Sequence, residues 1–221
     1  MKLVSALFPT SIEINDTMVS TIVIENRRLY LKVLKNLYAQ CHGGIGEIVL
    51  SENDETLKIS SHIEMITDFI AFEPDNKKFQ TKIQKMLEEE ILGGENYHRA
   101  MELLADIEKF MNDVSEIFSF SLDFDGINVN AMIKMSSPKW IDECNKEIEH
   151  ILNYMELVRE LFGEKLFVFA GMKDYYSDQD MQEFIYSVVA HKYRVLLMES
   201  RESSILDKEQ RLLIDNEICV I

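Results

Sequence analysis

One stretch, residues 164–201, constrains the fold of this chain more than any other. It reads EKLFVFAGMKDYYSDQDMQEFIYSVVAHKYRVLLMESR. Leu166–Ala170 and Val195–Met198 are short, nearly continuous apolar runs, as expected of strands that are covered on both faces. Between them, Ser177 is placed to cap a helix whose acidic first turn suits the positive end of the helix dipole. This order predicts a β-α-β unit with a right-handed crossover.

Units of this kind often bind nucleotides, and a phosphate-binding loop would carry Gly-x-x-x-x-Gly-Lys-Ser/Thr between a strand and a helix. Two stretches come nearest to it, Gly43–Gly46 and Ala170–Lys173. The first lacks the lysine and follows a predicted helix, and the second has one glycine and no hydroxyl at the required spacing. Glu199 ends a strand as magnesium-binding acids do in nucleotide hydrolases, but an ion pair with Arg201 is the favoured interpretation. We therefore expect plain turns at both stretches.

Other catalytic patterns are missing from the sequence. The five histidines form no His-Glu-x-x-His pair, and there is no Gly-x-Ser-x-Gly nucleophile turn. Nothing in the sequence commits the chain to catalysis, so we expect a protein that is not an enzyme.

The first sixty residues continue the α/β pattern. Ser20–Glu25 predicts a strand, and residues 27–40 predict a helix with one apolar face. Glu47–Leu50 predicts another strand, and Ile218–Ile221 a last short one. The apolar segment 63–72 fits a strand or a helix equally well.

The middle of the chain is helical in pattern. A first helix is expected over residues 75–92, with Asp75 as its cap, and a second over residues 97–118. A third is expected to start at Ser137 and Pro138 and to end at Phe162, with apolar residues in steps of three and four. The long helices are expected to pair with each other in antiparallel fashion. These patterns predict a discontinuous α/β head, residues 1–62 and 163–221, and a helical leg, residues 63–162.

The charge of the chain limits what its surface can bind. The formal net charge is −16, with 39 acidic and 23 basic side chains. Binding of nucleic acid over the whole surface is disfavoured, because phosphate contacts need positive charge nearby. A confined basic patch remains compatible with this total, since screening over about 8 Å makes local charge decisive.

Composition also bears on the compartment. The three cysteines are widely spaced and odd in number, which favours free thiols in a reducing cytoplasm. No apolar run reaches the roughly 20 residues that a transmembrane helix needs, and Pro9 and Glu13 interrupt the apolar N-terminus too early for a signal peptide. We expect a cytoplasmic protein without a membrane partner.

Two polar features lie close together in the predicted leg. Asp123 and Asp125 alternate with other residues before a glycine, a spacing that offers oxygen ligands to a cation such as calcium, although a solvated acidic turn is the simpler interpretation. Lys134 and Lys139 flank a Ser-Ser-Pro turn. Such lysines are usually just solvated, but in a ring of several copies they would be repeated and could surround phosphate groups.

Several segments together resemble the small accessory protein of type II-A CRISPR loci, a ring-forming family encoded beside the CRISPR integrase. None of these segments is a catalytic signature, so the resemblance depends on their order and spacing. They are Met65–Phe72, Leu122–Gly126, Ile133–Lys134, Lys165–Phe169, Val195–Arg201 and Leu213–Glu217.

The resemblance implies an α/β head like a degenerate P-loop ATPase, without a functional phosphate loop, and an inserted all-helical leg. Four copies would form a homotetrameric ring that admits double-stranded DNA, preferentially at free ends, and assists spacer acquisition against phage. The CRISPR integrase and the effector nuclease of the same locus would be its protein partners. Lys134 and Lys139 fall where the family places lysines in the pore of the ring.

The resemblance further implies calcium ions in the legs, with Asp123 and Asp125 in the acidic calcium segment. This chain departs from the family there, because Ser119 and Ser121 stand where relatives carry more carboxylates. Calcium binding is therefore expected to be weaker here, or absent.

Two other functions remain open on the sequence. The β-α-β unit leaves room for a nucleotide-dependent enzyme or switch of the ATPase type. The acidic surface would also suit an oligomeric scaffold for the integration complex.

Overall fold

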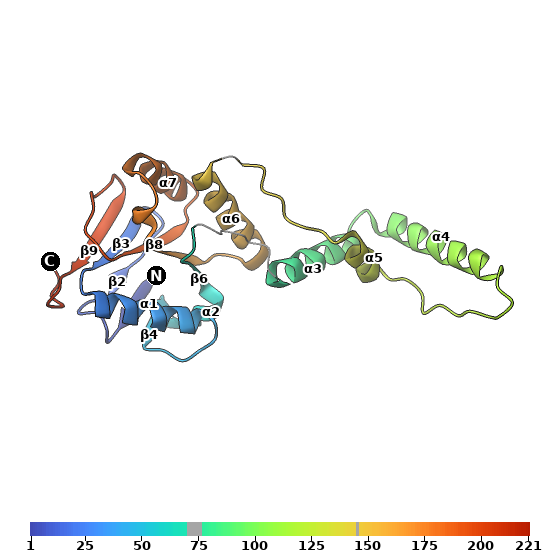
Figure 1. The fold of residues 1–221 in the computed structure, drawn as a ribbon, viewed down its shortest axis with the longest axis horizontal. Helices are drawn as coiled ribbons and strands as arrows, with labels where there is room; N and C mark the ends of the chain where they lie inside the picture. Colours follow the sequence, from blue (N-terminus) through green and yellow to red (C-terminus); the bar gives the residue numbers. More distant parts are fainter. Residues whose placement is uncertain (70–76, 145) are drawn as a thin grey trace. The chain divides into compact units, whose positions relative to one another are not determined.

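The chain divides into two compact units. The first joins Met1–Phe72 with Cys144–Ile221, and the second is Glu73–Glu143. The computed structural model describes residues 1–69, 77–144 and 146–221, and Figure 1 shows the course of the chain through both units.

A parallel sheet lies at the centre of the first unit. Its described strands, in spatial order, are β6 (Ile63–Ile66), β7 (Leu166–Ala170), β8 (Arg194–Glu199), β3 (Val19–Ile24) and β9 (Glu209–Ile214). Each neighbouring pair is parallel, with Thr21 opposite both Leu197 and Arg211. All six residues of β3 are buried, because this strand has neighbours on both sides and covered faces. The α/β class and the strand expected at Ser20–Glu25 are confirmed.

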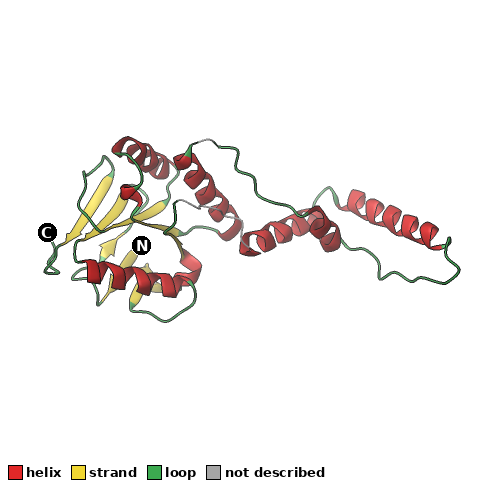
Figure 2. Cartoon of the chain, viewed as in Figure 1, coloured by secondary structure: helices red, strands yellow, loops and turns green. Residues whose placement is uncertain are grey.

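Helices cover the two faces of this sheet. Helix α1 (Arg27–Cys41) packs Leu29, Val33 and Leu37 into one core with Ile22 and Met198. Successive residues of a strand point to opposite faces of the sheet. Phe169, which follows Val168 of the α1 core, therefore points to the other face. Its ring meets that of Phe184 of helix α7 (Asp178–Ala190) edge-to-face, with 5.3 Å between the ring centroids. Figure 2 shows the two helices on opposite sides of the yellow strands.

A small antiparallel sheet completes the core beneath α1. Its order is β2 (Ile12–Glu13), β1 (Lys2–Ser5), β4 (Ile48–Glu52) and β5 (Glu55–Leu57). Leu3 and Leu50 of this sheet belong to the same apolar cluster as α1. The tight turn between β4 and β5 consists of Asn53 and Asp54, which adopt φ values of 52° and 65° as a two-residue hairpin requires. A one-turn helix, α2 (Ile59–His62), leads from this sheet to β6.

The predicted β-α-β unit is present as β7, a short 3-10 helix η1 (Met172–Asp174), α7 and β8. Ser177 caps α7 by accepting a hydrogen bond from the Asp180 amide at 3.2 Å, and the Asp180 carboxylate accepts from the Ser177 amide at 3.3 Å. This reciprocal capping box satisfies two backbone donors at the helix start.

The second unit contains the described helices α3 (Lys77–Gly93), α4 (Tyr97–Ser115) and α5 (Val129–Ser136). Its buried core is small: Leu104 of α4 packs with Val129 and Ile133 of α5. The first two leg helices are therefore close to their expected bounds, and Asp75, the expected cap, lies outside the described residues.

The third expected helix begins later than predicted. Helix α6 spans Glu147–Phe162, and residues 137–144 have no helical structure. Ser137 is the left-handed C-cap of α5, with φ 47°, and not the N-cap of a new helix. Apolar residues continue at helical spacing back to Ile141, which is 75 % exposed. The predicted helix was therefore too long, because spacing alone does not reveal which apolar residues are buried.

Helix α6 and strand β6 belong to the first unit. Met155 and Val158 of α6 are fully buried, and α6 packs against α7. The unit boundaries near residues 72 and 144 thus differ from the expected boundaries at 62 and 163, which placed both elements in the leg. The expected pairing of α6 with a leg helix is replaced by packing on α7.

The C-terminal strand was misplaced by the sequence analysis. The last strand of the described chain is β9, and residues 218–221 contribute only an isolated bridge between Val220 and Ile214. No helix in the described ranges is both long and apolar enough to cross a membrane.

Candidate nucleic-acid interface

Lys134 lies in the last turn of α5 and points away from the small core of the second unit. Asn128 caps this helix by accepting a hydrogen bond from the Ala131 amide at 2.8 Å, which fixes where the helix begins. Val129 and Ile133 then face the core, and the next residue, Lys134, is exposed. The positive charge of Lys134 also lies near the negative end of the helix dipole, where it stabilises α5.

Lys139 lies beyond the turn that ends α5. Ser137 donates from its amide to the carbonyl of Lys134 at 3.2 Å, and Pro138 follows, so the chain cannot continue the helix. Lys139 is exposed in the irregular segment after this turn. Within the described ranges, neither Lys134 nor Lys139 forms an ion pair, and both ammonium groups are therefore available to an external anion.

Asp123 and Asp125 are both exposed, in the connection between α4 and α5. The carboxylate of Asp123 accepts a hydrogen bond from the next amide, that of Phe124, at 3.0 Å. A third carboxylate lies close by: Glu108 of α4 accepts from the Ile127 amide at 3.3 Å. The sequence gives no sign of this contact, because nothing local links Glu108 to a turn nineteen residues away.

Asp123, Asp125 and Glu108 offer carboxylate oxygens to a cation. Carboxylate oxygens are the right ligands for calcium. Among the described residues, however, no group of three or more acidic, histidine or cysteine side chains is arranged to hold a metal ion. The donor chemistry fits calcium, but these carboxylates are not arranged as a formed site in the described part of the chain.

A nucleotide enzyme of this fold would bind phosphate at the carboxyl edge of the parallel sheet. Ligands of open parallel sheets bind beyond the carboxyl ends of the strands. At that edge, β3 passes into α1 through only Glu25 and Asn26, and the Asn26 side chain accepts a hydrogen bond from the Leu29 amide at 3.1 Å. Two residues without glycine cannot wrap a phosphate group, so this connection is a helix cap.

Lys173, the lysine of the second candidate phosphate loop, forms hydrogen bonds within the protein. Lys173 donates to both carboxylate oxygens of Glu209, at 2.7 and 2.8 Å, and to the carbonyl of Ser204 at 3.2 Å. Glu209 in turn accepts from the Thr21 hydroxyl at 2.6 Å. All three donor positions of the ammonium group are therefore used within the protein.

Glu199 differs from what the sequence suggested. Its carboxylate accepts a hydrogen bond from the Lys173 amide at 3.2 Å, whereas Arg201 lies 3.9 Å from Asp174. Burial raises the pKa of Glu199 to about 7, and the hydrogen bond and charge of Lys173 oppose this rise. The expected ion pair between Glu199 and Arg201 is wrong, because Arg201 turns outward and is 78 % exposed.

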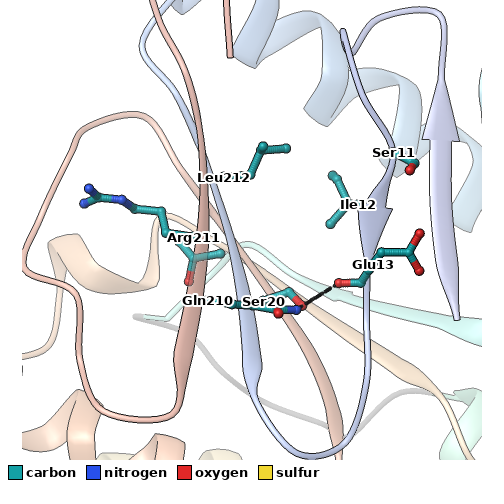
Figure 3. A pocket seen from close by; sticks show the side chains of 8 residues that line it. Ser11, Ile12, Glu13, Ser20, Gln210, Arg211 and Leu212 are labelled. Carbon is teal, nitrogen blue, oxygen red and sulfur yellow. Dashed lines mark hydrogen bonds between the residues drawn. The ribbon is translucent and has the colours of Figure 1, made fainter. Parts of the chain in front are cut away.

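A hollow in the first unit lies between β2, β3 and β9 and is drawn in Figure 3. Gln210 donates to the Ser20 hydroxyl at 2.8 Å and to the Glu13 carbonyl at 3.1 Å across its floor. Its volume of about 180 Å³ is below the usual range for small-molecule sites. These polar groups satisfy one another, so the hollow is a structural join between the two sheets.

Comparison with known proteins bears directly on the family. The model of the family described as CRISPR-associated protein (Cas_Csn2) matches residues 40–218. The chain belongs to this family. The resemblance drawn from the sequence is thereby confirmed, and this Cas_Csn2 chain is a CRISPR-associated protein.

One solved structure has a similar fold. The crystal structure of Stu0660 of Streptococcus thermophilus aligns with a TM-score of 0.60 and 15 % identity, over 96 % of this Cas_Csn2 chain and 74 % of that chain. A putative ABC transporter ATP-binding protein from Pyrococcus furiosus aligns at 13 % identity over 96 % and 97 % of the two chains, with a TM-score of only 0.39. No curated protein sequence matches the chain.

Proposed function

We propose that this protein is a non-enzymatic homotetrameric ring that binds double-stranded DNA, preferentially at its ends, and assists spacer acquisition in type II-A CRISPR immunity. The CRISPR integrase and the effector nuclease of the same locus are its proposed protein partners, in the cytoplasm. Membership of the Cas_Csn2 family supports the CRISPR setting.

The observation that carries the DNA proposal is the exposure of Lys134 and Lys139 on a strongly acidic protein. Both lysines are free of ion pairs to other described residues, whereas the whole chain has a net charge of −16. The acidic remainder repels DNA, so contact is confined to the places where lysines gather. Repetition of two lysines in four copies would provide eight cationic groups around one duplex.

The exposed apolar side chains of the second unit support assembly into an oligomer. Phe110 is 64 % exposed, Ile117 80 % and Met135 75 %. Where such side chains gather into a patch, they typically mark a contact with another chain. A ring would bury part of it.

A DNA-binding assay at several salt concentrations tests the proposal. Fluorescence anisotropy would compare a linear duplex with a covalently closed circle of the same sequence, and binding to the linear duplex is expected to be tighter. If all eight lysines contact phosphate, the logarithm of the binding constant should fall against the logarithm of salt with a slope of about −7. If the protein binds neither the linear nor the circular DNA, the proposal is excluded and an acidic scaffold is favoured.

A further inference from the structure

Residues 118–124 of the second unit, Phe-Ser-Phe-Ser-Leu-Asp-Phe, have the alternation of a β-strand but do not form one. Every second residue is apolar, and Phe118, Phe120, Leu122 and Phe124 are between 38 % and 60 % exposed. Such alternation and aromatic content are typical of strands with one covered face. The segment instead lies in the irregular connection between α4 and α5.

Two of the apolar side chains of this segment lie together. The rings of Phe118 and Phe120 are 5.3 Å apart between centroids, although residues 118–120 form bends in the single chain and would have to extend on pairing. Neither the amides nor the carbonyls of residues 119–123 form a hydrogen bond with any other described residue. The segment thus presents both exposed apolar side chains and unpaired backbone groups, the two features that a partner strand satisfies.

We propose that residues 118–124 pair with the same residues of a second copy of the chain, as two antiparallel strands related by a two-fold axis at Ser121. This proposal rests on the oligomeric assembly proposed above and identifies one of its contacts. The occupant is a second copy because the segment is complementary to itself, as an isologous interface requires.

The register follows from the positions of the apolar and acidic residues. With the axis at Ser121, Phe118 lies opposite Phe124, and Phe120 opposite Leu122, so all four apolar positions are matched. On the other face, Asp123 lies opposite Ser119, whose hydroxyl can donate to the carboxylate. An axis at residue 122 leaves Phe118 opposite Gly126, and an axis at residue 123 places Asp123 opposite itself.

The area available is appropriate for part of a stable interface. Aromatic side chains bury about 200 Å² each, and those of this segment are about half exposed, so eight side chains would cover on the order of 800 Å². A standard interface buries about 1,200 to 2,000 Å². Phe110 and Ile117, which are 64 % and 80 % exposed in the same unit, provide additional apolar surface.

Disulfide trapping tests the register directly. In a background with Cys41, Cys144 and Cys219 replaced by serine, Ser121→Cys places two thiols opposite each other, within the 7 Å between Cα atoms that a disulfide allows. Copper-catalysed oxidation at low protein concentration is expected to produce a covalent dimer on a non-reducing gel. Circular dichroism would verify that the serine background retains its fold.

Ser119→Cys is the matched control, because it introduces the same exposed side chain two residues away. Its two copies would lie about 14 Å apart along the paired strands, so cross-linking should be at least several-fold weaker. Adding Asp123→Cys to Ser119→Cys should restore the dimer band. Equal trapping at positions 119 and 121, or none at 121, would overturn the proposal.

A second measurement is independent of the introduced thiols. Phe120→Ser together with Leu122→Ser should lower the mass measured by light scattering, since two matched apolar pairs are lost. An unchanged mass would count against the strand pairing. DNA binding is not part of either readout, so failure of the DNA proposal would leave these outcomes intact, and the reverse also holds.

Discussion

The ammonium group of Lys173 lies 2.7 Å from one carboxylate oxygen of Glu209 and 2.8 Å from the other, in a pair whose side chains are 8 % and 0 % exposed. Lys173 follows β7 and Glu209 begins β9. The pair therefore links these two strands across β8 and β3, which lie between them in the sheet. The same lysine was the nearest approach to a phosphate ligand in the β-α-β unit. Its engagement with Glu209 makes it part of the scaffold.

Removal of this lysine is expected to destabilise the protein strongly. Lys173→Met would leave the Glu209 carboxylate buried with only neutral donors, at a cost of about 3 to 5 kcal/mol in the free energy of unfolding. Urea denaturation measures the change. The exposed Lys35→Met serves as control and should change stability by less than about 0.5 kcal/mol. A loss below about 1 kcal/mol for Lys173→Met would contradict the structural role of the pair.

The stability of the protein is expected to depend on pH through Glu199. Its pKa is raised from 4.5 to about 7 when the protein is folded, so the folded state binds the proton more tightly than the unfolded state. The stabilising contribution is complete below about pH 4.5 and is lost as the pH rises to about 7, a change of about 3 kcal/mol. Lys173, Asp174 and Glu209 are the charged groups that act on it.

Comparison with Glu199→Gln isolates this contribution. Glutamine has nearly the same shape but no titratable proton, so the difference in unfolding free energy between the wild type and the variant should shift by about 2.5 kcal/mol between pH 5 and pH 8. Urea titrations at several pH values provide the measurement. Parallel pH profiles for the two proteins would show that Glu199 does not titrate in this range.

DNA affinity is expected to depend on the two exposed lysines of the second unit. Lys134→Glu combined with Lys139→Glu should abolish DNA binding, because each change replaces a phosphate contact with a repulsive charge in every copy. The mass measured by light scattering should stay the same. Lys35→Glu with Lys58→Glu changes the net charge equally in the first unit and should retain most of the affinity. Wild-type affinity in the first double variant would refute the assignment.

Calcium binding is expected to involve Asp123 and Asp125. Isothermal titration should then detect saturable calcium binding by the wild type and its loss in Asp123→Asn with Asp125→Asn, because amides are weaker ligands than carboxylates. Asp113→Asn, an exposed position on α4, is the matched control. Absence of binding by the wild type would mean that the serines at positions 119 and 121 have removed the site.

Nucleotide binding is expected to be absent. The two-residue connection between β3 and α1 has no glycine, and Lys173 is engaged by Glu209. Isothermal titration with ATP and magnesium should therefore give no saturable heat. Measurable binding would revive the alternative of a nucleotide-dependent switch.

Local structure was largely predictable from residues that lie close together in the sequence. The strand at Ser20–Glu25 and the cap at Ser177 depend on alternation and on one side chain reaching a nearby amide, so neither requires distant partners. Sequence reasoning also identified Lys134 and Lys139 as exposed cations, because charged side chains beside a proline turn rarely pack inside. It missed β9, whose residues 210–212 are only half covered and so lack a continuous apolar run.

The sequence by itself determined which stretches have apolar faces and where helices can start, because backbone and capping energies act over a few residues. The tertiary structure alone decided what covers those faces and which charges meet. The apolar face of α6 is covered within the first unit, and Lys173 meets Glu209 from 36 positions away. The physical reason is that the spacing of apolar residues indicates which side chains are buried. Which residue packs against each of them depends on distances in space that only the folded chain establishes.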